Sequence, residues 1–176
     1  MSTHSGTDTA GTGCVRLDVP DAEAMRALGE RLAALLRGGD LVLLSGDLGA
    51  GKTTLTQGIG AGLGVRGPVT SPTFVIARVH PSLRGGPDLV HVDAYRLGSL
   101  AEVDDLDLDA SLADSVTVVE WGEGRAEALA EDRLEVRLVR SHEGPVDAGT
   151  DVADPRVAQV RGVGDRWAGV DLRGLA

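Results

Sequence analysis

The sequence has few aromatic residues and a single cysteine. Aromatic side chains make up 2% of its 176 residues, so the core must be built from leucine, valine and alanine. Cys14 is the only cysteine, which excludes an intramolecular disulfide and a cysteine-based metal cluster and fits a reducing, cytoplasmic setting. A mean hydropathy of +0.01 is too polar for a membrane protein, while 42% hydrophobic residues suffice for a folded core. We therefore expect a globular cytoplasmic protein that does not act at a membrane.

Positive charge is also scarce. The chain has 17 basic and 27 acidic residues, which gives a formal net charge of −10 and a pI near 4.7. Affinity for nucleic acid comes mostly from clustered lysine and arginine, so this surface is poorly suited to holding an RNA backbone by itself. Any role on RNA would therefore require a partner.

The order of polar and apolar segments predicts one folded domain. Residues 1–13 are small and polar and are expected to form a disordered leader without a signal peptide. The folded domain is expected over 14–164, followed by a C-terminal tail of uncertain structure over 165–176. Asp21 is expected to cap a helix that runs to about Arg37. Further strands are expected over 41–45, 73–79, 88–93, 116–120, 134–139 and, as an edge strand, 156–163, and further helices over 51–63, 99–114 and 125–130.

These elements favour an α/β fold with a mostly parallel central sheet flanked by helices, as in P-loop NTPases. The apolar run over 41–45 is typical of a strand that is covered on both faces, as the strands of parallel sheets are.

A glycine-rich motif follows this run and opens the next predicted helix. Residues 46–53 read GDLGAGKT and match G-x-x-x-x-G-K-[ST]. Glycines let such a loop curl so that backbone N–H groups point at phosphate oxygens, and the helix N-terminus adds a partial positive charge. Lys52, the only lysine among the 17 basic residues, would neutralise the β- and γ-phosphates, and the Thr53 hydroxyl is a magnesium ligand. Thr54 is close enough in sequence to contact the α-phosphate.

Two acids end apolar strands and are candidates for the metal or for the attacking water. Asp93 ends the strand predicted over 88–93, and Glu120 ends the strand predicted over 116–120. In an open parallel sheet the carboxyl ends of the strands line the ligand crevice, so both carboxylates are expected to face the glycine-rich loop. The alternative for either residue is a solvated acid where a strand meets a loop.

Four other features allow a functional and a structural interpretation. His91 is either a packed histidine or a functional one, and Arg96 either reaches a phosphate or pairs with an acid. Residues 71–74 (SPTF) are either a phosphate-sensing switch or a turn. Trp121 either forms a wall of the site or fills the core.

Four segments together resemble the TsaE (YjeE) family, the bacterial P-loop ATPases of tRNA threonylcarbamoyladenosine synthesis. These segments are GDLGAGKTTLTQG at 46–58, SPTF at 71–74, HVDAYRL at 91–97 and VVEWGE at 118–123. The resemblance extends over about 18–163 and implies that the domain at 14–164 is a P-loop ATPase domain.

The resemblance also implies roles for individual residues. Nucleotide binding is implied for Gly49, Ala50, Gly51, Lys52, Thr53, Thr54, Trp121 and Arg156. Thr53 and Glu120 would hold magnesium, and Asp93 would be the Walker-B-type acid. Lys52, Asp93 and Glu120 are thus the expected catalytic residues, with ATP or ADP and magnesium as cofactors.

The implied partner is the TsaD–TsaB complex, which would hold the tRNA and stimulate an otherwise weak ATPase. Two alternatives share the same motif: a small-molecule kinase, and a nucleotide-gated adaptor without significant hydrolysis. A translation-type GTPase is disfavoured, because reading guanine through N/T-K-x-D requires a second lysine and the chain has only Lys52.

Overall fold

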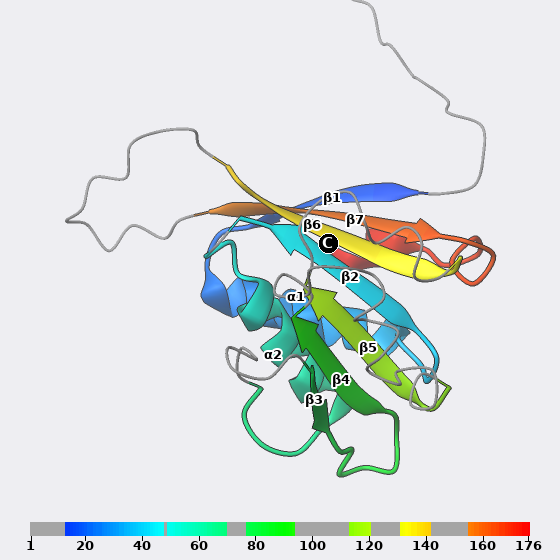
Figure 1. The fold of residues 1–176 in the computed structure, drawn as a ribbon. Coiled ribbons are helices and arrows are strands. Elements are labelled where there is room, and N and C mark those ends of the chain that lie inside the picture. The colour runs from blue at the N-terminus through cyan, green and yellow to red at the C-terminus, as the bar shows by residue number, and fades with distance from the viewer. Residues whose placement is uncertain (1–12, 48, 70–76, 94–112, 121–130, 142–154) are drawn as a thin grey trace, which may run out of the picture.

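The computed structural model describes residues 13–47, 49–69, 77–93, 113–120, 131–141 and 155–176. The described elements are β1 (Cys14–Val19), α1 (Ala22–Leu35), β2 (Leu41–Gly46), α2 (Lys52–Leu63), β3 (Ala77–His80), β4 (Asp88–Asp93), β5 (Ser115–Glu120), β6 (Arg133–Arg140), β7 (Arg156–Val163) and the short 3₁₀ helix η3 (Leu172–Leu175). The strands form one seven-stranded sheet in the order β1-β7-β6-β2-β5-β4-β3 (Figure 1).

The predicted α/β class with a P-loop type of sheet is confirmed. The central strands β6, β2, β5 and β4 pair in parallel. The outer strands β1, β7 and β3 pair antiparallel with their neighbours. The parallel part of this mixed sheet therefore coincides with the strands nearest the glycine-rich loop.

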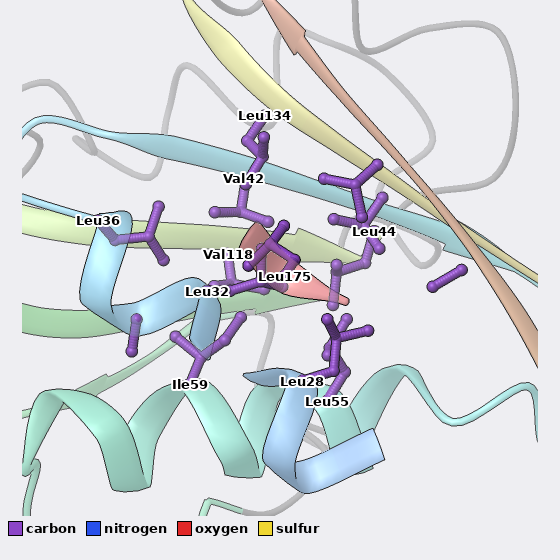
Figure 2. Packing of buried hydrophobic residues seen from close by; sticks show 14 of the residues in the cluster. Leu28, Leu32, Leu36, Val42, Leu44, Leu55, Ile59, Val118, Leu134 and Leu175 are labelled. Atoms are coloured by element: carbon purple, nitrogen blue, oxygen red, sulfur yellow. The ribbon is translucent and has the colours of Figure 1, made fainter. Parts of the chain in front are cut away.

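Both faces of β2, β4 and β5 are buried. Leu41, Val42, Leu43 and Leu44 of β2 and all six residues of β5 are shielded from solvent, as expected for continuous apolar runs in a parallel sheet. Helices α1 and α2 cover one face together (Figure 1). The core under them is built from aliphatic side chains of both helices and the sheet, and Figure 2 shows this packing around Leu28, Leu32, Leu55 and Ile59.

Helices α1 and α2 pack unusually closely because glycines lie at their contact. A Cβ placed on Gly29 of α1 would lie 2.7 Å from the Cα of Gly58 on α2. No side chain fits into so short a distance, so the backbone of each helix rests directly on the other. This contact determines the position of α2, whose first turn carries Lys52 and Thr53.

Most predicted elements lie close to where the sequence suggested. The Asp21 carboxylate accepts a hydrogen bond from Ala24 N at 2.8 Å and caps α1, which ends at Leu35, two residues before the predicted end. The strand over 88–93 is confirmed with its bounds. Of the strand predicted over 73–79, only residues 77–79 are described, and they lie in β3. The helices predicted over 99–114 and 125–130 lie essentially outside the described residues.

The strand predicted over 156–163 is confirmed with its bounds, but its predicted edge position is wrong. Strand β7 lies between β6 and β1, because residues 14–19 form an additional antiparallel strand that takes the edge position. A strand at 14–19 was not predicted, because the short alternating segment CVRLDV buries only Leu17 and Val19.

The C-terminal segment packs against the domain. Trp167, Leu172 and Leu175 are buried, and η3 contacts α1 and β1. Arg166 forms a bidentate ion pair with Asp40, with Nε 3.0 Å from Oδ1 and Nη2 2.9 Å from Oδ2. The same guanidinium donates to the Leu35 carbonyl at 2.8 Å, so residues after β7 are tied to the connection between α1 and β2.

Arg166→Ala is expected to lower the free energy of unfolding by about 3 kcal/mol, because it leaves a buried carboxylate without its counterion. The side chain of Asp40 is only 5% exposed. Urea denaturation at pH 7 measures the change. Arg173→Ala, which removes an exposed arginine from the same segment, is the control and should change stability by less than about 0.5 kcal/mol. Equal losses for the two variants would contradict the assigned role of the buried pair.

Candidate functional site

The glycine-rich loop turns from the end of β2 into the first turn of α2. Gly46, Gly49 and Gly51 have φ angles of 152°, 78° and 103°, which side-chain-bearing residues rarely adopt. Ala50 N donates to the Asp47 carbonyl at 2.9 Å and closes the turn. Gly51 occupies the N-cap position, where its lack of a side chain leaves the first N–H groups of α2 without a side-chain cap. The loop therefore presents backbone amides at a helix N-terminus, the arrangement that binds anions.

Lys52 folds back over this loop. Its Nζ donates a hydrogen bond to the carbonyl oxygen of Gly46 at 2.7 Å, and the side chain is half-buried. The only ammonium side chain of the protein thus lies against the turn and not out in solvent.

Glu120 lies at the end of β5 and connects this loop to β4. The hydroxyl of Thr53 lies 3.5 Å from Glu120 Oε1, a long hydrogen bond. Nε2 of His91 lies 2.9 Å from the same oxygen. Glu120 is only 7% exposed, so its carboxylate is held in a largely buried position between α2 and β4.

Asp93 ends the neighbouring strand at the same level. The register pairs Asp93 of β4 with Glu120 of β5, and Glu120 with Leu44 of β2. The two strand-end acids predicted from the sequence are therefore neighbours. Glu120 lies one strand away from β2, which leads into the loop, and Asp93 lies two strands away. Asp93 is half-buried.

Arg156 approaches the loop from β7. Its Nη2 donates to the Gly49 carbonyl at 3.1 Å and its Nε lies 3.3 Å from the Ala50 carbonyl. These contacts give hydrogen-bond partners to carbonyl groups of the turn, which backbone polar groups require when they are shielded from water. Arg140, which the sequence analysis did not select, lies opposite Arg156 on β6 and comes close to Gly49.

The described part of the chain leaves some candidates untested. Trp121, Arg96 and residues 71–74 lie outside the described residues. Thr54 lies in the first turn of α2 and is half-buried, next to Thr53. Of the two interpretations of His91, its contact with Glu120 brings it to the candidate site, while its full burial also makes it part of the core.

A second histidine, His80 of β3, is buried near His91. Burial lowers the pKa of His80 below its ordinary value, and electrostatic interactions with His91 and Arg78 act in the same direction. A hydrogen bond with the backbone of Arg66 opposes this shift of the pKa. Burial therefore favours the neutral form of His80.

Within the described residues, none of the helices has the length and apolar character needed to cross a bilayer.

A glycine-rich loop between a buried parallel strand and a helix, with acids at the ends of neighbouring strands, defines a P-loop domain of the α/β class. The family model described as threonylcarbamoyl adenosine biosynthesis protein TsaE matches residues 19–146. The chain belongs to the TsaE family, which confirms the resemblance stated from the sequence.

Relatives and a solved structure agree with this assignment. A Streptomyces coelicolor protein named tRNA threonylcarbamoyladenosine biosynthesis protein TsaE is 65% identical over 153 residues, or 86% of this chain and 99% of that protein. Proteins of the same name from Mycobacterium tuberculosis and Bacillus subtilis are 52% and 39% identical, over 73% and 68% of this chain and 81% and 73% of their own lengths. The crystal structure of Bacillus subtilis YdiB superposes with a TM-score of 0.66 at 28% identity and covers 90% of this chain and 92% of that one.

Gly46→Ala is expected to lower the free energy of unfolding by about 3 kcal/mol, through backbone strain and a steric clash. The added Cβ would lie 2.8 Å from the Leu138 carbonyl oxygen, at a φ of 152°. Gly67→Ala is the control, because Gly67 also has a positive φ, 78°, but no atom of the described residues lies within 4 Å of the added Cβ. It should cost about 1 kcal/mol. Urea denaturation measures the free energy of unfolding of both variants. An equal loss in Gly46→Ala and Gly67→Ala would show that the loop tolerates a side chain at its first residue.

Proposed function

We propose that this chain is the magnesium-dependent ATP-binding and ATP-hydrolysing component of tRNA threonylcarbamoyladenosine biosynthesis. Membership of the TsaE family supports the pathway. The observation that carries the ATPase assignment is the arrangement of Lys52 against the glycine-rich loop, with Thr53 next to the buried carboxylate of Glu120.

The loop supplies the groups that a nucleoside triphosphate requires. Amides of Gly49 and Gly51 and the first N–H groups of α2 are donors for phosphate oxygens, whereas the Ala50 amide donates to the Asp47 carbonyl within the turn. Lys52 adds a compact positive charge for the β- and γ-phosphates, and Thr54 is within reach of the α-phosphate. Arg156 holds the loop carbonyls from outside, which keeps the turn curled around the ligand.

Thr53 and Glu120 fit a magnesium ion. A hydroxyl and a carboxylate are the hard oxygen donors that Mg²⁺ prefers, and a P-loop site completes the coordination with phosphate oxygens and water. The bound ion would neutralise negative charge that develops on the phosphates during hydrolysis.

The strand-end acids would orient the water molecule that attacks the γ-phosphate. Asp93 or Glu120 would orient a water molecule in line with the γ-phosphate, while Lys52 stabilises the charge of the transition state. Trp121, the residue after Glu120, is proposed to lie near the nucleotide.

The proposed partner is a TsaD–TsaB-type complex in the cytoplasm. The formal net charge of −10 makes direct binding of tRNA unfavourable, so the tRNA would be held by the partner proteins. The ATPase would be weak in the isolated chain and stimulated in the assembly.

Lys52→Ala is expected to weaken ATP binding at least about tenfold, because the site loses its only ammonium. Lys52→Arg keeps the charge but not the compact shape, and we expect it to restore little of the affinity. Isothermal titration calorimetry with ATP and excess magnesium measures both, with thermal unfolding as a check of folding. Unchanged affinity in Lys52→Ala would place the nucleotide elsewhere.

ATP turnover should rise when the TsaD–TsaB complex is added, and Glu120→Ala should abolish turnover with and without partners. Phosphate release measures turnover. Asp114→Ala removes an exposed acid just before β5, is the matched control and should behave as wild type. Equal turnover with and without partners would contradict the partner dependence. Transfer of phosphate to a small molecule would favour a kinase, and tight binding without turnover would favour a nucleotide-gated adaptor.

A further inference from the structure

His91 is a fully buried polar residue beside a proposed metal ligand. Its side chain is 0% exposed, and its Nε2 lies 2.9 Å from Glu120 Oε1. It belongs to β4, two residues before Asp93, and its neighbour across the sheet is Val118 of β5. The imidazole thus reaches diagonally between neighbouring strands to the acid at the strand end.

The imidazole carries a polar group that its surroundings leave unsatisfied. Nδ1 of His91 is buried and has no hydrogen-bond partner among the residues that the structure describes. An orphaned buried acceptor costs free energy, so an apolar side chain would fill this position at lower cost if packing were the only requirement. What the histidine adds is its hydrogen bond to the Glu120 carboxylate, which is stronger than a bond between neutral groups because the acceptor is charged.

The contacts of Glu120 are unevenly distributed over its two oxygens. Within the described residues, the hydrogen bonds from Thr53 and from His91 both fall on Oε1. The Thr53 contact is long, at 3.5 Å, so the 2.9 Å contact to His91 is the one that fixes the carboxylate. One oxygen is thereby anchored, and Oε2 keeps its lone pairs for another ligand.

We propose that His91 is a positioning residue that orients the Glu120 carboxylate for a divalent cation bound with the nucleotide. Nε2–H donates to Oε1 and fixes the rotation of the carboxylate, so that Oε2 is held ready for the cation or its water. Hydrogen bonds to ligating side chains commonly tune metal sites in this way. The inference rests on the proposed function, because it requires that a nucleotide and magnesium bind at the glycine-rich loop.

Two amide substitutions separate this role from core packing. The Nε2 of glutamine can occupy nearly the position of the histidine Nε2, whereas the amide of asparagine ends near the position of Nδ1 and is too short to reach Glu120. His91→Gln and His91→Asn therefore both leave an amide in the core but differ in the hydrogen bond. His80→Asn is the matched control, since His80 is also a buried histidine, on the strand next to β4, and its Nε2 has no partner in the described part of the chain.

The experiment measures ATP affinity of the full chain by calorimetry, once in EDTA and once in excess Mg²⁺. The dissociation constant in EDTA divided by the dissociation constant in Mg²⁺ gives the contribution of magnesium to ATP affinity. Thermal unfolding is recorded for each variant. We expect His91→Asn to lower this ratio about tenfold without changing the affinity in EDTA. His91→Gln should recover most of the ratio, and His80→Asn should leave it unchanged.

A ratio in His91→Asn equal to that of wild type overturns the proposal, as does an equal loss in His91→Asn and His91→Gln. If the asparagine variant does not fold, His91→Met makes the same comparison with an apolar side chain of similar size. Wild-type protein that binds ATP in EDTA but gains nothing from magnesium contradicts the metal site and this inference, while leaving the nucleotide site intact. Wild-type protein that binds no ATP under either condition overturns the proposed function itself.

Discussion

Parallel pairing of β2 with β5 and of β5 with β4 determines where the polar groups of the site can lie. Because the three strands run in the same direction and in register, their carboxyl ends reach one edge of the sheet together. The loop after Gly46, Glu120 and Asp93 therefore become neighbours although they are far apart in sequence. A shift of one residue in the pairing of β5 would turn Glu120 to the other face of the sheet and separate it from Thr53.

The second requirement is a fixed position for α2, which carries Lys52 and Thr53. Direct backbone contact between Gly29 and Gly58 brings α1 and α2 together with no side chain between them. The hydrogen-bond distances around Glu120 depend on this contact, because α2 supplies one of its two partners and β4 supplies the other. The Glu120 carboxylate is therefore held from two sides, by Thr53 of the helix pair and by His91 of the sheet.

Local chemistry made the loop and the strand ends predictable. The spacing of glycines around Lys52 identifies the motif from the sequence alone. An apolar run that ends in an acid predicted the bounds of β4, and two such runs in neighbouring parallel strands predicted that Asp93 and Glu120 lie at the same edge of the sheet. Long-range pairing was not predictable in this way. Arg166 meets Asp40 across 126 residues, and the short alternating pattern of β1 does not reveal that it displaces β7 from the edge. The contact of His91 with Glu120 likewise depends on strand order, which no single segment encodes.

The position of Lys52 also has a consequence for chemical labelling. The chain contains no other lysine, and the Lys52 ammonium is half-buried and hydrogen-bonded to the Gly46 carbonyl. Among the side chains, an amine-directed cross-linking reagent therefore has one amine target, and the reactivity of that amine follows how tightly the turn is closed.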